Sequence, residues 1–490
     1  MTAAGGERQR ALRNVGWSAV QRWTVRLAGV VTFVVLGRLL EPGEIGLATL
    51  AVAVVGLLAV VADLGMTTFL VQADEADRRT TSTVFWTALG LGCTGAGLLA
   101  LVAGPVAAAL DEPDAAPVLR ALAGGLVLTS LTVVPAALML RAMRFRAMAG
   151  RGVGAALVSA AVGIGLAVAG AGVWALVAQN LVQNAVSLVW FWVAARWWPS
   201  ATFSRPALRE AWRFGSALLG INLVQALRDR ADGVLIGSLG GLDLLGYWAV
   251  ATRLLGLLHE VTMSVMDHVA LPLFVRLRDD LPRFERGYET AGALSTAALA
   301  PLVAVLAAVS PVVVPGLFGQ QWEPSVLPAQ LLAVAYGVGA VGYFNRSALL
   351  AFRRSGTAWA VAVGSLVLHV VVLLVAAPAG LPVLAAALGA AQVLTVVGSA
   401  VVLRRTVGVG LRAYDRSVRA LLCAAVSVGP MLLVTGTVPG WGGAVLAGTV
   451  GLGIYAGLLW LVDRSLVREG VSDIRGILRR RATAVPATAR

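Results

Sequence analysis

Three ionisable residues, Arg253, Glu260 and Asp267, follow one another at intervals of seven inside an apolar segment that runs from Leu244 to Phe274. Seven residues are about two turns of an α-helix, so the three side chains leave the helix on one face. A charged residue in the hydrocarbon core costs at least ~2.5 kcal/mol on insertion scales, and such residues normally face a water-filled cavity or one another. The spacing therefore predicts a polar path through a membrane protein.

The composition is that of an integral membrane protein. Of the 490 residues, 58% are hydrophobic and only 13% are charged, whereas a soluble domain is about 45–50% apolar and about 25% charged. The net charge of +14 is distributed over the ends of the apolar segments. This distribution favours anionic lipid headgroups over nucleic acid as a partner.

Motifs for covalent chemistry are not recognisable in the chain. The cysteines, Cys93 and Cys423, both lie in apolar segments, which argues against a disulfide or a metal site. We find no phosphate-binding loop, no zinc-type His/Cys spacing and no acidic loop of the glycosyltransferase kind. The sequence predicts no enzyme, no cofactor and no metal.

Apolar runs long enough to cross a bilayer recur about fourteen times. The spans are expected near 15–37, 45–70, 82–104, 118–140, 153–170, 173–195, 214–237, 244–268, 290–314, 327–351, 357–377, 381–403, 418–437 and 442–462. The connecting segments alternate between arginine-rich loops, such as the one from Arg276 to Arg286, and short loops nearly free of arginine, such as the one from Asp111 to Asp114. The positive-inside rule then predicts that the arginine-rich loops and both termini are cytoplasmic.

An internal repeat is visible when the chain is shifted by 200 residues. The shift places Gly37, Gly46 and Gly56 on Gly237, Gly246 and Gly256. An even number of spans separates the matched segments, so the halves are predicted to be parallel repeats about an axis along the membrane normal. The predicted all-α polytopic fold has a tail at 1–14, a six-helix N-lobe at 15–200, a six-helix C-lobe at 201–405, two helices at 406–463 and a basic amphipathic tail at 464–490.

Charged residues inside the predicted spans form the candidate site. The arginines assigned to substrate binding are Arg22, Arg26, Arg230, Arg253 and Arg346. The carboxylates assigned to ion coupling or charge balance are Asp63, Asp232, Glu260 and Asp267. Arginine offers a permanently charged planar fork that fits phosphate oxygens, and carboxylates can bind and release protons or Na⁺.

Structural alternatives stand beside this assignment. Internal ion pairing that fixes helix packing is an alternative for the whole set, and above all for Arg228 and Asp229. Arg22 can instead extend its side chain to the cytoplasmic surface. Arg346 with Asn345 is either a polar cluster or the cytoplasmic approach of its helix.

Several short motifs together resemble one transporter family. They are Ala62-Asp63-Leu64-Gly65, Ser82-Thr83-Val84-Phe85-Trp86, Arg141-Ala142-Met143-Arg144-Phe145-Arg146, Gly172-Val173-Trp174-Ala175-Leu176-Val177-Ala178-Gln179, Asp232-Gly233-Val234-Leu235-Ile236-Gly237 and Phe318-Gly319-Gln320-Gln321-Trp322. The set resembles the polysaccharide-exporter branch of the oligosaccharide flippases, of the colanic-acid exporter type, in the multidrug/oligosaccharidyl-lipid/polysaccharide superfamily. The resemblance runs from about residue 10 to about residue 405.

The resemblance implies a MATE-like pair of six-helix lobes in a bacterial plasma (inner) membrane. It implies a transporter that carries a lipid-linked oligosaccharide, on polyprenyl diphosphate, from the inner to the outer leaflet for polysaccharide export alongside polymerase machinery. Asp63, Asp232 and Arg253 match family positions, whereas Gly233 stands where the family usually has an acidic or amide residue. Coupling to Na⁺ or to protons stays open.

Two other functions are alternatives to this one. A cation-coupled multidrug or small-molecule antiporter of the same superfamily would favour carboxylates and aromatic residues over arginines in its cavity. A membrane polymerase or glycosyltransferase would need a large outer loop, and the predicted outer loops are only a few residues long.

Overall fold

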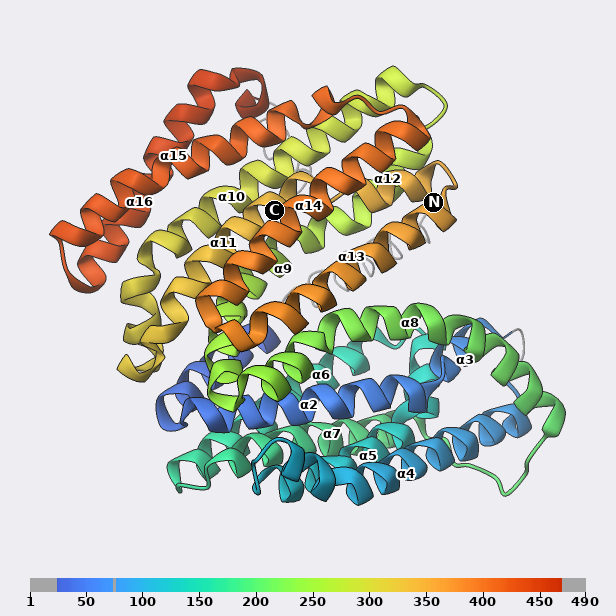
Figure 1. Ribbon diagram of the computed structural model, residues 1–490. Coiled ribbons are helices and arrows are strands. Elements are labelled where there is room, and N and C mark those ends of the chain that lie inside the picture. Colours follow the sequence, from blue (N-terminus) through green and yellow to red (C-terminus); the bar gives the residue numbers. More distant parts are fainter. Residues whose placement is uncertain (1–23, 74–75, 469–490) are drawn as a thin grey trace, which may run out of the picture. The chain divides into compact units, whose positions relative to one another are not determined.

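The computed structural model describes residues 24–73 and 76–468, and every regular element in these ranges is a helix (Figure 1). Arg22, the predicted N-terminal tail and most of the predicted basic C-terminal tail lie outside the described residues. The elements are helix 24–39, α2 (Pro42–Asp63), α3 (Met66–Gln72), α4 (Arg78–Ala109), α5 (Ala115–Arg141), α6 (Phe145–Val168), α7 (Val173–Ala195), α8 (Arg205–Gly240), α9 (Leu242–Leu277), α10 (Leu281–Phe318), η1 (Gln320–Ser325), α11 (Val326–Val341), α12 (Asn345–Ala351), α13 (Ser355–Ala376), η2 (Ala377–Ala379), α14 (Leu381–Val407), η3 (Leu411–Tyr414), α15 (Asp415–Thr437) and α16 (Gly440–Val462).

Eleven helical segments among the described residues are long and apolar enough to cross a membrane. The predicted all-α, polytopic class is confirmed, and the count of about fourteen stays a prediction. The first predicted span lies partly outside the described residues. The seventh and eighth correspond to α8 and α9, which are 36 residues long but are not among the eleven. In α8 the apolar sequence is interrupted by four charged residues between Arg228 and Asp232.

Two predicted spans are broken in the structure, which corrects the sequence analysis. The predicted helix 45–70 ends at Asp63, because Leu64 and Gly65 take positive φ angles of 44° and 66° before α3 begins. The predicted helix 327–351 is α11 followed by the short α12, with a turn at 342–344. Helical breaks of this kind free backbone groups and usually accompany polar positions inside membrane proteins.

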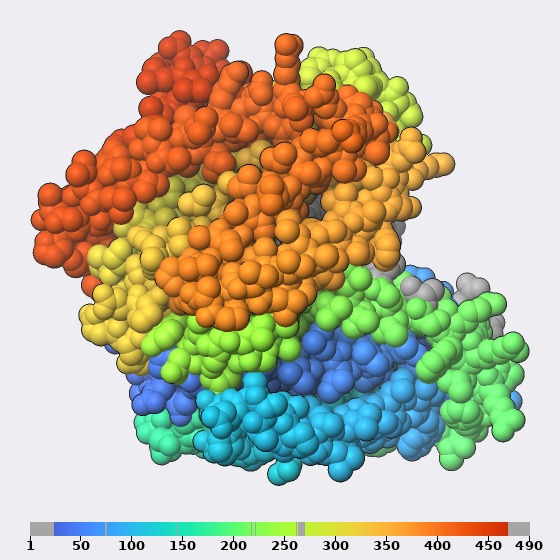
Figure 2. Space-filling model, viewed as in Figure 1, coloured from blue at the N-terminus to red at the C-terminus, as the bar shows by residue number. Residues whose placement is uncertain are grey.

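The chain forms two compact units, each with its own packing. Unit 1 comprises residues 1–249 and 317–321, and unit 2 comprises residues 250–316 and 322–490. The boundary falls inside α9, and the predicted lobe boundary at residue 200 stays a prediction. In unit 1, α2 contacts α4, α5, α7 and α8 and so forms the centre. In unit 2, α11 packs on α14 and α15 packs on α16, and α13 to α16 cover the visible face of this unit in orange and red (Figure 2).

The starts of α2 and α9 pack against each other through glycines of the predicted repeat. A Cβ atom on Gly46 would lie 1.9 Å from the carbonyl oxygen of Leu242, and one on Gly246 would lie 2.0 Å from that of Pro42. Leu242 and Pro42 are themselves 200 residues apart, so the two contacts are reciprocal. Both helices therefore begin at this contact, and the parallel repeat of the two halves stays a prediction.

Candidate functional site

The charged segment of α8 lies against α2 in unit 1. Arg230 donates a hydrogen bond from Nη1 to the carbonyl oxygen of Val52 over 3.2 Å, and the residue is partly buried. The residue before it, Asp229, accepts a hydrogen bond of 2.9 Å from the side-chain amide of Gln225, one turn earlier on the same helix. Arg230 therefore contacts the centre of unit 1, whereas Asp229 stays exposed on its own helix.

The carboxylate of Asp232 is oriented by a residue of the next helix, α9. Its Oδ2 accepts a hydrogen bond of 3.2 Å from the indole nitrogen of Trp248, whose side chain is buried. The following residue, Gly233, is also buried, and a Cβ atom there would lie 2.7 Å from the Cβ of Ala53 on α2. This close approach favours glycine at position 233, since any side chain would push α8 away from α2.

Asp63 ends α2 at the helix break. Its Oδ1 accepts a hydrogen bond of 2.6 Å from the Thr67 hydroxyl and one of 3.4 Å from the Thr67 backbone N–H. The two residues line a cavity of about 180 Å³ together with Thr129, Ser130 and Thr132 of α5. The carboxylate thus both stabilises the turn into α3 and faces a small cavity with hydroxyl groups.

Arg253 and Glu260 lie on α9 within unit 2, and both are exposed. Seven residues of helix separate them, about 10 Å along the axis, which agrees with the predicted common face. Asp267 belongs to the same helix, but its side chain lies outside the described residues. His259, between the two, packs its ring against Tyr336 and Tyr343, each at 5.6 Å between ring centroids.

Asn345 and Arg346, neighbours at the start of α12, lie in different environments. Asn345 is 3% exposed; its Oδ1 accepts hydrogen bonds from the hydroxyls of Tyr288 and Tyr414, and its Nδ2 donates to Ser399 over 2.7 Å. Arg346 is exposed. Of the two alternatives that the sequence leaves open, the polar cluster therefore applies to Asn345. Its hydrogen bonds connect α10, α12, α14 and η3.

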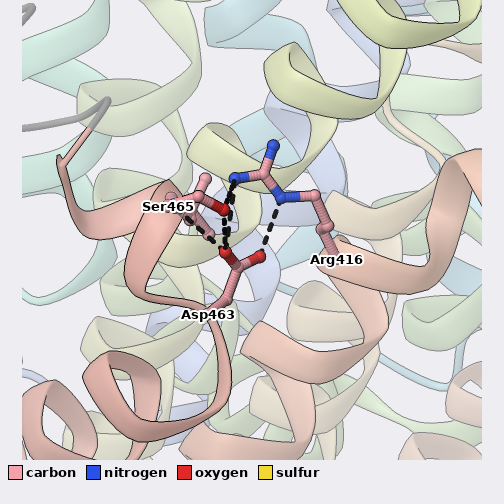
Figure 3. A network of polar contacts seen from close by, with 4 residues as sticks. Arg416, Asp463 and Ser465 are labelled. Atoms are coloured by element: carbon pink, nitrogen blue, oxygen red, sulfur yellow. Dashed lines mark hydrogen bonds and ion pairs between the residues drawn. The ribbon is translucent and has the colours of Figure 1, made fainter.

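An ion pair connects α15 to the segment after α16 (Figure 3). Arg416 Nε donates to Asp463 Oδ2 over 2.7 Å, and Asp463 Oδ1 also accepts from the hydroxyl of Ser465 and the N–H of Leu466. Burial alone would raise the pKa of Asp463, but these hydrogen bonds and the arginine charge outweigh it and lower the pKa to about 2. The pair fixes the end of the α15–α16 hairpin.

The predicted site residues are divided between the two units. Arg26, Asp63, Arg230 and Asp232 belong to unit 1, whereas Arg253, Glu260 and Arg346 belong to unit 2. Within unit 1, Asp63 and the Arg230 contact at Val52 are eleven residues apart on α2, which is about 16 Å of helix. Asp63 and the contact made by Arg230 therefore lie at different positions along α2.

Two features escaped the sequence analysis. Trp248, the partner of Asp232, carries no charge and looks like any apolar residue of α9. The arginines at the end of α14, in η3 and at the start of α15, among them Arg404, Arg412 and Arg419, entered only as topology signals, yet they line a cavity of about 710 Å³. Their density within a short stretch of sequence was the signal that could have indicated a site.

Similarity to known proteins agrees with this architecture. The succinoglycan biosynthesis transport protein ExoT of Rhizobium meliloti is 29% identical over 326 residues, and the match covers 66% of each chain, just under two thirds. The lipopolysaccharide biosynthesis protein WzxC of Escherichia coli is 25% identical over 361 residues, which is 71% of each chain.

Two solved structures share the fold. The lipid II flippase MurJ, in an inward closed conformation, superposes with a TM-score of 0.75 and 11% identity over 92% of this chain and 99% of its own. An inward-facing multidrug resistance MATE family transporter superposes with a TM-score of 0.58 and 14% identity over 78% of this chain and 94% of its own. The protein is thus a multi-pass membrane protein with a MurJ- and MATE-like fold. Residues 35–327 match the family model described as polysaccharide biosynthesis protein, and the chain belongs to this family.

Proposed function

We propose that this protein carries a lipid-linked oligosaccharide, attached to polyprenyl diphosphate, from the inner to the outer leaflet by alternating access between its repeats. The family match over residues 35–327 is the observation that carries the proposal. Relatives named for succinoglycan transport, lipopolysaccharide biosynthesis and teichuronic acid biosynthesis all serve cell-surface polysaccharides. The product is a polysaccharide precursor delivered to polymerase machinery outside the membrane.

The arginines supply the chemistry that a diphosphate needs. Arg26, Arg230 and Arg253 bind its oxygens in the inward-facing state, and Arg22 and Arg346 attract it at the cytoplasmic approach. A guanidinium has five N–H donors, and the Val52 carbonyl uses one donor of Arg230. The hydrogen bond orients the group without saturating it, so the remaining donors can meet phosphate oxygens.

The carboxylates balance these charges when the cavity is empty. Asp232, oriented by Trp248, Asp63 at the helix break and the pair Glu260 and Asp267 on α9 serve this role and can carry a proton or Na⁺ on the return step. A cationic drug as cargo is disfavoured, because cavity arginines would repel it. Both termini face the cytoplasm, in line with the arginine-rich loops.

The test is flipping of a fluorescent polyprenyl-diphosphate oligosaccharide in vesicles that contain the purified protein. Arg253→Gln should abolish flipping, and Arg253→Lys should restore it only in part, because the bidentate fork is lost. Arg405→Gln, an exposed arginine at the end of α14, serves as the matched control and should flip normally. Full activity of Arg253→Gln would remove this residue from the site, and transport of a cationic dye in place of the lipid would refute the proposed function.

A further inference from the structure

A second charged cavity, of about 710 Å³, lies entirely within unit 2. Three parts of the chain enclose it: the first two turns of α10, the end of α14 with the loop into η3, and the first turns of α15. The volume is within the range of small-molecule sites, about 300–1,000 Å³. All three parts border loops that the positive-inside rule predicts to be cytoplasmic.

Buried contacts fix the walls of this cavity. The backbone N–H of Gly410 donates to Glu285 Oε1 over 2.6 Å, which ties the loop before η3 to α10. Tyr414 at the end of η3, next to the cavity-lining Ala413, donates to Asn345 over 2.7 Å. Arg416 is held by Asp463. The lining is therefore preorganised, which reduces the entropy that a ligand loses on binding.

The charge of the lining is positive. Five arginines and three carboxylates face the cavity: Arg286, Arg404, Arg412, Arg416, Arg419, Glu285, Glu289 and Asp415. Glu285 is engaged by Gly410, whereas the guanidinium groups of Arg404 and Arg412 make no hydrogen bond or ion pair with another described residue. The start of α15 adds the positive end of a 23-residue helix. Converging guanidinium groups beside a helix N-terminus suit phosphate oxygens.

We propose that this cavity binds a phosphate-bearing anion through Arg404, Arg412 and Arg419, and that the bound group holds α15 against α10 and α14. A guanidinium fork donates paired hydrogen bonds to two phosphate oxygens, while Glu289 and Asp415 can accept hydrogen bonds from hydroxyls on the same ligand. The phosphate is that of an anionic phospholipid headgroup or of a soluble phosphate. This site is independent of the proposed transport of the lipid-linked oligosaccharide.

Native mass spectrometry and thermal unfolding of the detergent-purified full chain test the proposal. Phosphatidylglycerol, phosphatidylcholine and inorganic pyrophosphate are the three probes, at constant ionic strength. The double variant Arg404→Gln/Arg412→Gln should bind the phosphate probe at least about tenfold more weakly, since it loses charge-assisted hydrogen bonds to the phosphate. Both side chains are exposed, so the variant keeps its fold, which its unliganded unfolding temperature checks.

The control is Arg405→Gln, which removes the same charge from the residue next to Arg404 but not from the cavity lining. Stabilisation by phosphatidylglycerol alone would assign the site to a lipid headgroup, and competition by pyrophosphate would assign it to a soluble phosphate. The proposal would be overturned if the double variant and Arg405→Gln bound phosphatidylglycerol equally. It would also be overturned if the unmodified protein bound phosphatidylcholine and phosphatidylglycerol equally and pyrophosphate had no effect.

Discussion

The guanidinium group of Arg230 on α8 occupies the space that a side chain at Gly56 on α2 would fill. A Cβ atom on Gly56 would lie 2.6 Å from Cζ and 2.7 Å from Nη1 of Arg230. Atoms cannot approach this closely. If Gly56 carried a side chain, the flexible end of Arg230 would therefore move before the backbone does. Gly56 thus sets the position from which Arg230 reaches the Val52 carbonyl.

Substitution of Gly56 by alanine should therefore act as a displacement of Arg230. We expect Gly56→Ala to reduce flipping of the lipid-linked oligosaccharide about as much as Arg230→Gln does, with little change in unfolding temperature. The combined variant should be no worse than either single variant, because both remove one interaction. Vesicle flipping assays measure this. If the defects of Gly56→Ala and Arg230→Gln multiply in the combined variant, the two residues act separately.

Gly46 and Gly246, the reciprocal glycines at the starts of α2 and α9, differ from Gly56, because backbone carbonyl groups and not a flexible side chain lie next to their Cβ positions. Gly46→Ala and Gly246→Ala would each force a methyl group to about 2 Å from a carbonyl oxygen, so we expect each to cost about 1–3 kcal/mol of unfolding free energy. Gly256→Ala is the matched control, since nothing lies within 4 Å of its Cβ position. Thermal unfolding in detergent gives the comparison, and equal stability of Gly46→Ala and Gly256→Ala would show that the helices separate without cost.

The sequence predicted the helices well and their side-chain partners poorly. Apolar runs and arginine-rich loops follow from the bilayer itself, so most spans were placed correctly. The break after Asp63 was missed, because the strained φ angle of Leu64 leaves no mark in the composition. The Trp248 partner of Asp232 and the Tyr288 partner of Asn345 depend on packing between helices. Hydropathy cannot specify which faces of two helices meet.

The buried polar network in unit 2 should be important for stability. Asn345→Ala would leave the hydroxyls of Tyr288 and Tyr414 without their acceptor. A buried polar group that loses its partner costs about 1–3 kcal/mol, so the expected loss is roughly 2–5 kcal/mol. Ser399→Ala deprives only the Asn345 amide and should cost about half as much. Thermal unfolding ranks the two, and a more stable Asn345→Ala protein would contradict the assigned network.

The Arg416–Asp463 ion pair predicts a pH dependence of stability. Because the folded pKa of Asp463 is about 2, below the usual 3.8, its stabilisation is present above pH ~4 and is lost as the pH falls through about 2. The difference corresponds to roughly 2 kcal/mol. Asp463→Asn should therefore lower the unfolding temperature at pH 7 and approach the unmodified protein near pH 2. Asp279→Asn, whose side chain is 89% exposed, should have no measurable effect at any pH.

The proposed cargo predicts that the membrane potential alone drives transport. A diphosphate carries roughly two negative charges, and moving each out of the negative cytoplasm is favoured by about 2.3 kcal/mol per 100 mV, or roughly 4–5 kcal/mol in total. In the proposed cycle the arginines remain with the protein, and Glu260 and Asp267 neutralise them when the cavity is empty. Flipping should therefore follow an imposed K⁺ diffusion potential in vesicles that have no Na⁺ or proton gradient.

In the proposed cycle the carboxylates act when the empty protein returns. Glu260→Gln should slow continuous flipping while leaving a single round of substrate binding unchanged, because the arginine charge then has no partner when the empty cavity closes and excludes water. Glu260→Asp, which keeps the charge, is the matched control and should remain closer to the unmodified rate. A rate that ignores the potential but disappears with the Na⁺ or proton gradient would mean that ions bound at the carboxylates, and not the electric field on the diphosphate, drive the cycle.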